Sequence, residues 1–439
     1  MSPEDFRRAG HEVVDWIADY LAGIRDYPVL PQKRPGELVD ALPSSGPERG
    51  ESIDRILADF RELVVPDVTH WNHPRFYAYF SVSASAPGIL GEMLTAALNM
   101  NGMLWKSSPA VTELEQVTMS WLRQWLGLPD DFFGLIYDTA SISTMHAIAA
   151  AREAMFPEVR TEGALHDAVL YTSEHSHSSV EKGAITLGVG QKNVRKVPVD
   201  SDFRMKPDAL QKLIQTDVAA GKRPFCVVAT TGTTSTTSID PVPDVAAIAK
   251  RHGLWLHVDG AYGLAALCSS IARERFRGIE RADSFGVDPH KWLFAPYDSA
   301  ALMYRDPRPA AATHAQHGAY LDAVNRGDWN PSDYAYHLSR RARGLPLWFG
   351  LATYGTSAYT EAVDSAIRTA ASFADQVAAH PDFTLLLEPE LSIVLFTRDG
   401  WTWEQYSQWS KQRAGEGTYL VVPTSWQGAP CLRICIVHP

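Results

Sequence analysis

His290 and Lys291 stand side by side after residues 282–287, an apolar segment that we predict to be a short buried strand. Asp288-Pro289 ends this strand, because proline has no N–H to donate to a sheet. A lysine in a buried turn has a destabilised ammonium form, and such lysines serve as nucleophiles toward carbonyl groups. The alternative is a surface turn with a solvated lysine, the ordinary situation for this residue. The chemical groups at neighbouring strand ends distinguish the two interpretations.

Polar turns also follow four other apolar segments that we predict to be strands. Near-continuous apolar strands that alternate with helices predict a mainly parallel sheet covered on both faces. The carboxyl ends of parallel strands meet at one edge, where ligands bind in open α/β sheets. We therefore expect a site at this edge that joins Lys291 to Thr139, Ala140 and Ser141 after strand 133–137, His177 after strand 168–171, Thr234 after strand 225–229 and Asp259 after strand 254–258.

These residue types suit a cofactor that stores electrons. Residues 139–141 open a helix, where free N–H groups and the helix dipole favour a phosphate, although a plain N-cap explains the same residues. Asp259 could keep a pyridine nitrogen protonated, or it could be an ordinary turn aspartate. His177 could stack on an aromatic ring or transfer protons, or it could be a solvated loop histidine. With Lys291 as a Schiff-base nucleophile, the set predicts pyridoxal phosphate.

The composition is that of a soluble globular protein. The 439 residues are 45% hydrophobic and carry a formal net charge of -11, which gives no electrostatic argument for nucleic acid or membrane surfaces. The first residues lack a secretory signal, and no apolar run is long enough to span a bilayer. The cysteines are too few and scattered for a disulfide framework or a zinc site, so we expect no metal and a cytoplasmic location: Cys226, Cys268, Cys431 and Cys435.

The hydrophobic pattern divides the chain into three parts. Residues 1–80 hold two amphipathic helices, 5–24 and 52–65, joined by a proline-containing segment that cannot form its own core, so we expect an arm that packs on another surface. Residues 81–345 form the large α/β domain, and residues 346–439 form a smaller α+β domain. Residues 314–331 have little periodicity and predict a mobile loop.

Further elements follow from periodicity and turn residues. We predict helices at 90–99, 111–126, 142–155, 242–252, 339–354 and 362–378, and strands at 299–304, 391–396, 419–423 and 432–437.

Several motifs of the chain, in this order, resemble those of the group II pyridoxal-phosphate decarboxylases, specifically the aromatic-L-amino-acid decarboxylases. The resemblance covers nearly everything from Phe6 to Val437. Its most specific segments are Thr69-His70-Trp71, His73-Pro74, residues 76–80, Ser108-Pro109-Ala110, Thr112-Glu113-Leu114-Glu115, His177-Ser178-Ser179-Val180-Glu181, Gly232-Thr233-Thr234-Ser235, His257-Val258-Asp259, Ala261-Tyr262 and Asp288-Pro289-His290-Lys291-Trp292.

The resemblance implies a type I, aspartate-aminotransferase-like fold and a homodimer with active sites at the subunit interface. It implies that Lys291 bears the Schiff base, that Asp259 pairs with the pyridine nitrogen and that His177 stacks on the ring. The remaining cofactor positions that it implies are Thr139, Ala140, Ser141, Thr234, Ala261 and His290. Residues 1–80 then match the dimer-forming flap of the family.

The resemblance also implies decarboxylation of an aromatic L-amino acid of the tyrosine, dopa, phenylalanine or tryptophan type to the amine and CO₂. Tyr320, in loop 317–321, matches the family's catalytic tyrosine, which protonates Cα. In related aldehyde-forming enzymes this tyrosine is typically phenylalanine, or the stacking histidine is changed. Tyr320 and His177 are both present here, which favours the amine. An aldehyde synthase, and a cofactor-free binding protein of the same fold, are the alternatives.

The resemblance places the substrate pocket at Trp71, Phe80, Ser81, Val82, Asn101 and Met103. Animal members commonly have Pro-Thr at Ser81-Val82 and apolar or aromatic residues at the other two positions, so the preferred substrate is open. Residues 138–141 read Asp-Thr-Ala-Ser, where Gly-Ser-Ala-Ser is usual. Family members usually continue beyond the strand of Arg433 into a terminal helix, whereas this chain ends at Pro439.

Overall fold

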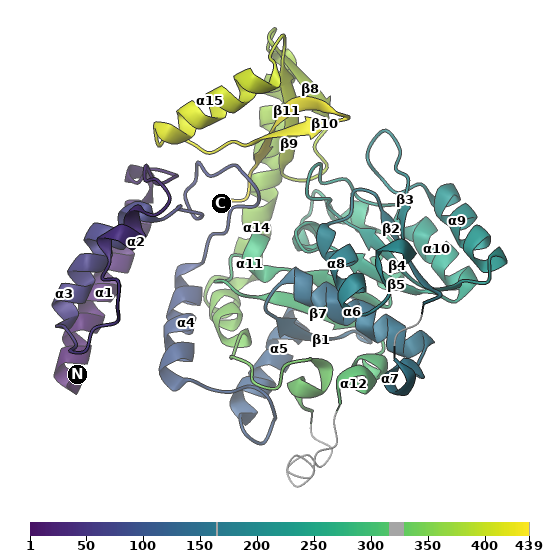
Figure 1. Cartoon of the computed structure of the whole chain (residues 1–439), viewed down its shortest axis with the longest axis horizontal. Coiled ribbons are helices and arrows are strands. Elements are labelled where there is room, and N and C mark those ends of the chain that lie inside the picture. Colours follow the sequence, from purple (N-terminus) through teal and green to yellow (C-terminus); the bar gives the residue numbers. More distant parts are fainter. Residues whose placement is uncertain (164–165, 316–328, 439) are drawn as a thin grey trace. The chain divides into compact units, whose positions relative to one another are not determined.

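The chain divides into two compact units. A computed structural model describes residues 1–163, 166–315 and 329–438 (Figure 1). The first unit comprises Met1–Ser81, Val377–Leu386 and Leu395–His438, and the second comprises Val82–Gln376 with Leu387–Val394. The N-terminal segment thus clusters with the C-terminal residues in a single unit. The three-part division expected from the sequence stays a prediction.

A seven-stranded sheet, among the residues described, forms the centre of the second unit (Figure 1). β7 runs antiparallel to both of its neighbours, whereas β2, β3, β4, β5 and β6 pair in parallel. The predicted, mainly parallel sheet is therefore confirmed. In spatial order the strands are β1 (Phe133–Tyr137), β7 (Ala300–Tyr304), β6 (Ser284–Val287), β5 (Trp255–Asp259), β4 (Arg223–Thr230), β2 (Ala168–Ser173) and β3 (Val194–Val197).

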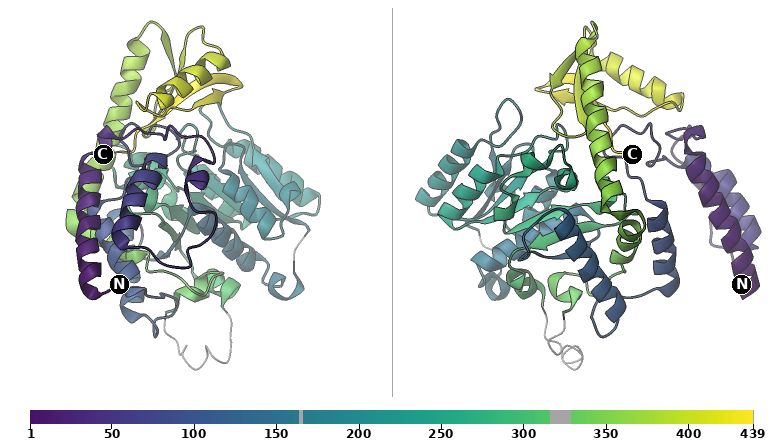
Figure 2. Two further views of the ribbon diagram at one scale, coloured as in Figure 1. Left: turned by 60° about the vertical axis from the view of Figure 1, so that its left-hand side comes forward. Right: turned by 180° about the vertical axis from the view of Figure 1, so that it is seen from behind.

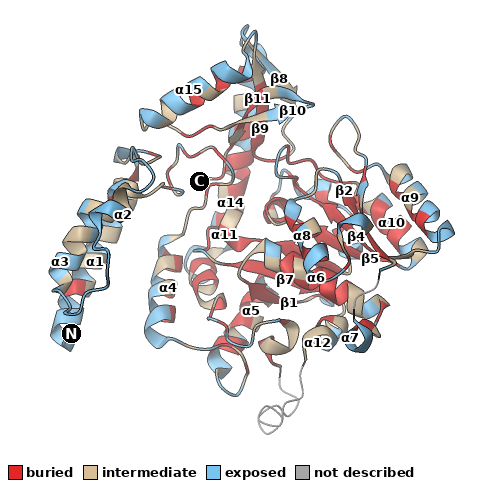
Figure 3. Ribbon diagram, viewed as in Figure 1, coloured by how far each residue is buried: buried red, intermediate tan, exposed pale blue. Residues whose placement is uncertain are grey.

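Burial on both faces explains why these strands are apolar at successive positions. Every residue of β2, β5, β6 and β7 is buried, as the red strands in Figure 3 show. A strand with one solvated face would alternate between polar and apolar residues instead. The core around the sheet includes Leu170, Phe225, Val228 and Leu302, each with no exposed surface.

Helices flank this sheet on the chain's return paths between parallel strands. α6 packs against β1, β4, β5, β6 and β7, whereas α9 and α10 pack against β4. α10 ends at Gly253 in the left-handed conformation (φ 66°) with basic residues in its last turn, a favourable termination. The helices of this unit are α4 (Ala86–Leu98), α5 (Pro109–Trp125), α6 (Ala140–Met155), α7 (Val159–Glu162), α8 (Ser178–Thr186), α9 (Pro207–Ala219), α10 (Val242–His252), α11 (Pro289–Trp292) and α12 (Arg308–His314). α14 (Gly344–Ala379) leads from the second unit into the first.

In the first unit, the N-terminal helices lie side by side (Figure 2). α1 (Pro3–Ala22) begins with a capping box at Ser2, and α3 (Ile53–Asp59) begins at the N-cap Ser52. Arg8 pairs with Asp54 at 2.6 Å, and Trp16 packs edge-on against Phe60. α2 (Glu37–Ala41) lies between them in sequence. The helix predicted at 5–24 is confirmed, whereas the one predicted at 52–65 is α-helical only over Ile53–Asp59 and continues as a π-helix over Phe60–Val64.

A small sheet with strand order β10-β11-β9-β8 lies near the C-terminus. Its strands are β8 (Phe383–Leu387), β9 (Ile393–Arg398), β10 (Pro423–Trp426) and β11 (Ala429–Cys435), and α15 (Trp403–Gly415) packs on β10 and β11. Residues 29, 76, 78 and 420 form a separate buried cluster in this unit, and Phe76 pairs with Leu420 in a short parallel bridge.

The structure corrects three predictions of local structure. The helix expected from Ser339 begins at Gly344, and the helix expected from 362 is the same α14 beyond a kink at Gly355 (φ 73°). The strand expected at 419–423 begins only at Pro423. β3 and α9 were not predicted. No helix in the described ranges is long and apolar enough to cross a membrane.

Candidate active site

The register of the central strands places the predicted site residues at one edge of the sheet. Asp259, the last residue of β5, is paired with Thr230 at the end of β4 and with Gly286 near the end of β6. The chain then turns away from the sheet at Asp288, whose N–H donates to the carbonyl of Ala261 at 2.9 Å. The turns after β4, β5 and β6 therefore meet, as the sequence predicted.

Lys291 lies in the four-residue helix α11, directly after β6. Its Nζ is 2.9 Å from Oδ2 of Asp288, and its side chain is 21% exposed. Burial lowers the pKa of Lys291, but the Asp288 carboxylate more than compensates, so the pKa is raised. The Asp288 carboxylate therefore favours the ammonium form of Lys291, which corrects the destabilised ammonium ion expected from the sequence.

His290, on the same turn, is buried and neutral. Its Nδ1 accepts a hydrogen bond from the N–H of Ser299 at 3.1 Å, so the ring proton lies on Nε2, which is 3.5 Å from Oδ2 of Asp288. Burial lowers the pKa of His290 despite the nearby carboxylate. The ring stacks on Tyr297 with a centroid distance of 4.2 Å.

Asp259 is a buried carboxylate at the end of β5, with 6% of its surface exposed. Its Oδ1 accepts the N–H of Ala261 at 3.1 Å, which fixes the carboxylate against the following turn. His257 precedes it by two residues, so the two side chains project from the same face of the sheet. Burial lowers the pKa of His257 to about 4, which keeps this ring neutral beside Asp259.

His177 is the N-cap of α8. The Ser179 N–H donates to its Nδ1 at 3.2 Å, so the ring carries its proton on Nε2. The surrounding protein desolvates the ring and lowers the pKa of His177, although part of the residue is exposed. The ring is therefore both oriented and neutral.

The turn after β1 opens α6 at Ala140, with Thr139 as N-cap. The first N–H groups of a helix have no acceptor within the helix, and the Thr139 side chain makes no capping hydrogen bond within the described ranges. α6 is 16 residues long, so its dipole adds to these donors. The Thr139 N–H already donates to Oδ1 of Asp138 at 2.9 Å, so Ala140 and Ser141 are the residues of this turn whose N–H groups suit an anion, and a phosphate site here stays a prediction.

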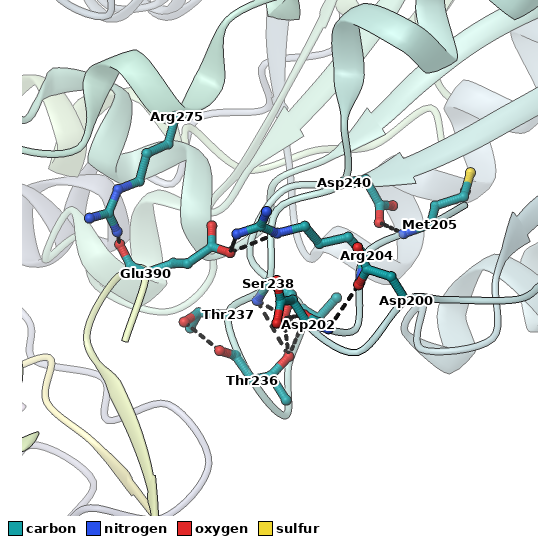
Figure 4. A network of polar contacts seen from close by, with 11 residues as sticks. Asp200, Asp202, Arg204, Met205, Thr236, Thr237, Ser238, Asp240, Arg275 and Glu390 are labelled. Atoms are coloured by element: carbon teal, nitrogen blue, oxygen red, sulfur yellow. Dashed lines mark hydrogen bonds and ion pairs between the residues drawn. The ribbon is translucent and has the colours of Figure 1, made fainter. Parts of the chain in front are cut away.

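The turn after β4, which carries Thr234, is held by a chain of hydroxyl groups (Figure 4). Oγ1 of Thr236 lies 2.7 Å from both Oγ1 of Thr233 and Oγ of Ser238, and Ser238 donates to the carbonyl of Asp202. Gly232 (φ 100°) passes so close to Gly263 that a Cβ on Gly263 would lie 2.1 Å from the carbonyl oxygen of Thr231. The turn is therefore fixed on either side of Thr234.

Ionic contacts stabilise the segments around this turn (Figure 4). Glu390 pairs with the Arg204 guanidinium, and its carbonyl accepts from Arg275. Asp240, which is 1% exposed, accepts the N–H groups of Thr230 at 2.8 Å and Met205 at 2.7 Å. The two hydrogen bonds of Asp240 connect the end of β4 to the segment that contains Met205.

The residues predicted to form a substrate pocket belong to both units. In the first unit, Trp71 packs on Phe76 at 4.6 Å and its carbonyl accepts from Ser81, while Arg433 lies over the Phe80 ring at 5.2 Å. In the second unit, the Asn101 amide oxygen accepts the N–H of Arg340 at 3.1 Å, and its amide nitrogen is 3.5 Å from the Met103 sulfur. Val82 begins the second unit. Each group is formed separately, and a common pocket stays a prediction.

Arg340 also forms a buried ion pair with Glu115, and sequence reasoning missed this pair. The guanidinium donates to the Glu115 carboxylate at 2.8 and 3.0 Å and to the carbonyl of Ile136, while Glu115 accepts the N–H of Ile136. The family motif that includes Glu115 marked this residue as important, but its partner Arg340 lies 225 positions further along the chain, so the sequence did not indicate the pair. Asp288 was likewise overlooked as a contact of Lys291. Tyr320 lies outside the described residues.

A mainly parallel sheet with a lysine, a carboxylate and a helix N-terminus at its carboxyl edge defines the class: an aspartate-aminotransferase-like (type I) enzyme of pyridoxal phosphate. Residues 35–398 match the pyridoxal-dependent decarboxylase conserved domain. The chain belongs to that family and is a pyridoxal-phosphate-dependent decarboxylase.

Known proteins resemble the chain over nearly its whole length. Tyrosine decarboxylase 2 of Arabidopsis thaliana is 38% identical over 90% of this chain and 75% of its own. Phenylacetaldehyde synthase of Petunia hybrida is 37% identical over 90% and 80%. The crystal structure of Oryza sativa TDC with PLP and tryptamine superposes with a TM-score of 0.95 at 31% identity, covering 100% of this chain and 94% of that one.

The residues at the sheet edge fit pyridoxal phosphate. The uncapped end of α6 suits its phosphate, the Asp259 carboxylate suits a protonated ring nitrogen, and the Lys291 amine suits its aldehyde. Buried polar atoms without a hydrogen-bond partner among the described residues lie at the same strand ends: Oγ1 of Thr172, Thr230 and Thr231, and Oγ of Ser299. Such atoms are expected where a polar ligand completes the site.

Proposed function

We propose that this protein decarboxylates an aromatic L-amino acid to the arylalkylamine and CO₂. The observation that carries the proposal is the meeting of Lys291, Asp259 and the α6 N-terminus at one sheet edge. The substrate class is supported by the similarity to a tyrosine decarboxylase and to a structure solved with tryptamine. Which aromatic amino acid is preferred is left to experiment.

Each residue has a separate task in this proposal. Lys291 would hold the cofactor covalently, Asp259 would accept a hydrogen bond from its ring nitrogen, and the N–H groups of α6 would bind its phosphate. Bound pyridoxal phosphate supplies an electron sink for the electron pair left behind when the carboxyl group departs as CO₂. His177, neutral and oriented by Ser179, would stack on the ring face.

The buried carboxylate of Asp259 would orient the ring and would keep its nitrogen protonated, since a nearby negative charge favours the protonated form. Tyr320 would then give a proton to Cα of the substrate. Because Tyr320 lies outside the described residues, its role is carried by the motif alone.

A visible absorption band of the bound cofactor tests the assignment of Lys291. The wild-type protein incubated with pyridoxal phosphate and desalted should retain this band, and Lys291→Ala should lose it. Lys182→Ala, at a lysine of α8, is the matched control and should keep the band. Equal colour in the wild type and Lys291→Ala would refute the assignment.

An aldehyde synthase is the second candidate, because phenylacetaldehyde synthase is similar over most of the chain. The presence of both Tyr320 and His177 favours the amine. A panel of aromatic amino acids with detection of amine, CO₂ and hydrogen peroxide separates the two reactions. We expect amine and CO₂ without peroxide, and Tyr320→Phe should lower the amine yield while cofactor binding persists.

We also propose that the protein works as a homodimer. Within the described residues of the second unit, α4 and α5 expose several large apolar side chains, an arrangement typical of an interface: Leu90, Met93, Leu94, Leu98, Val117 and Trp121. Light scattering should give the mass of two chains, and Leu94→Glu should shift it toward one. Val218→Glu, at a similarly exposed position of α9, is the control and should leave the mass unchanged.

A further inference from the structure

Asp288 contacts Nζ of Lys291, the reactive atom, and has no task in the proposed function. Its side chain is 2% exposed, and its Oδ2 lies 2.9 Å from Nζ of Lys291. Its Oδ1 is buried and accepts no hydrogen bond from any group in the described part of the chain. A buried, charged carboxylate with an oxygen that accepts no hydrogen bond is energetically costly, and protonation removes the cost of burying the charge.

The contact with Asp288 poses a chemical problem for Lys291. An ammonium ion has no lone pair, so it cannot attack an aldehyde, and the carboxylate stabilises this ammonium form. The same contact offers a solution, because the proton can move along the hydrogen bond from Nζ to the carboxylate. This shift produces a neutral amine and a neutral acid without any change in the net charge of the pair.

We propose that Asp288 is the proton acceptor that frees the Lys291 amine when the protein captures its cofactor. This inference rests on the proposed role of Lys291. The Nζ lone pair would form a bond to the aldehyde carbon, a second Nζ proton would move to the carbonyl oxygen, and the C–O bond would break so that this oxygen leaves as water while the C=N bond forms. The ammonium proton passes to Asp288, and Asp288 returns it when the water departs, so the pair takes no net proton from solvent.

Other titratable groups face the pair and do not serve this purpose as well. Asp259 and Tyr297 act on Lys291 through their charge and raise its pKa. The pKa values of His290 and His177 are lowered, mainly by burial, so both rings are neutral. Asp288 combines hydrogen-bond distance to Nζ with a second oxygen that receives no hydrogen bond from the residues that the structure places.

The proposal predicts an unusual pH dependence of cofactor capture. Transfer within the pair moves one shared proton between Lys291 and Asp288. The fraction of the pair that has a neutral amine is therefore independent of pH while the pair holds that proton. An amine that must lose its proton to solvent reacts about tenfold faster per pH unit below its pKa. Nα-acetyl-lysine in solution behaves in this second way. Because it reacts with the same cofactor, the ratio of the protein's rate to its rate removes the effect of the cofactor's own titration.

The test measures, by stopped-flow absorbance between pH 5.5 and 9.5, how fast the cofactor-free protein captures pyridoxal phosphate. The ratio of the wild-type rate to the Nα-acetyl-lysine rate should fall about tenfold per pH unit. Asp288→Asn should make the rate rise with pH where its amine titrates, and Asp288→Glu should restore the wild-type profile. Circular dichroism checks that the variants fold, and the comparison with Nα-acetyl-lysine needs no variant.

The outcomes separate this inference from the proposed function. A wild-type profile parallel to that of Nα-acetyl-lysine, or equal profiles for wild type and Asp288→Asn, would overturn the role of Asp288. In that case a band that is present in wild type and absent in Lys291→Ala still supports Lys291 as the cofactor lysine. Absence of the band in the wild type would refute the proposed function itself.

Discussion

The carboxylate of Glu115 and the guanidinium of Arg340 form a bidentate ion pair in the interior of the second unit, and their side chains are 0% and 1% exposed. Glu115 comes from α5, and Arg340 precedes α14. Both also bind the backbone of Ile136 in β1, and the Arg340 N–H binds Asn101. The pair therefore fastens a predicted pocket residue to the sheet that carries the cofactor site.

Replacing Glu115 by Gln should destabilise the protein strongly. The Arg340 charge would stay buried without its counter-charge, which typically costs about 3–5 kcal/mol. Glu361→Gln is a matched control, since Glu361 pairs with Arg368 on the surface, where an ion pair is worth about 1 kcal/mol or less. Urea unfolding measures both. A loss in Glu115→Gln no larger than in the control would contradict this account.

The strands and the location of the site could be predicted because both depend on local pattern. Apolar runs such as 133–137 and 168–171 mark strands buried on both faces, and the topology of parallel strands brings their ends together. Lys291 and Asp259 were found in this way. β3 was missed because Val194-Arg195-Lys196-Val197 is short and half polar, and its strand conformation depends on pairing with β2.

Long-range partners could not be predicted. Ser339 to Arg343 has helix-forming residues, yet α14 begins only at Gly344, because Arg340 reaches across to Glu115 and its backbone pairs with residues 101 and 102. Asp288 was taken as a residue that ends a strand. Its contact with Lys291 depends on the turn of α11, which folds Nζ back onto the carboxylate.

Gly263→Ala should destabilise the protein and weaken cofactor retention. The added Cβ would lie 2.1 Å from the carbonyl oxygen of Thr231, so the backbone that leads to Thr234 must shift. Overpacking of this kind costs about 1–3 kcal/mol. Gly10→Ala in α1, where nothing lies within 4 Å, is the control and should stabilise slightly. Thermal unfolding and equilibrium dialysis of the cofactor measure the two effects, and unchanged values for Gly263→Ala would refute the prediction.

Asp240 should make the protein less stable as the pH rises from about 4 to about 6. Burial raises the pKa of Asp240 to about 6, although the N–H groups of Thr230 and Met205 oppose this shift. Between these pH values the folded state holds a proton on Asp240 that the unfolded state releases. The free energy of unfolding therefore decreases by about 3 kcal/mol over the interval. The free energy of unfolding of the wild type, relative to that of Asp240→Asn, should therefore fall by that amount from pH 4 to pH 7. The exposed Asp15→Asn should show a much smaller change, and similar changes in both variants would exclude Asp240 as the source.

His146 should have the opposite effect and destabilise the protein in acid. Its Nδ1 lies 2.8 Å from the carbonyl of Ile142 and its Nε2 accepts the N–H of Tyr336 at 3.0 Å, so a second ring proton would face another donor. Burial lowers the pKa of His146 to about 4, and that of the neighbouring His314 to about 3.

Below pH 6.5 the unfolded state takes up a proton that folded His146 refuses, so stability falls as the pH drops from about 6.5 to about 4, by about 3 kcal/mol for His146. His146→Gln keeps one donor and one acceptor at every pH and should lose this acid sensitivity. His11→Gln, at an exposed position of α1, should keep it. Thermal midpoints between pH 4 and pH 8 measure the difference, and equal acid sensitivity in the two variants would show that His146 is not the group responsible.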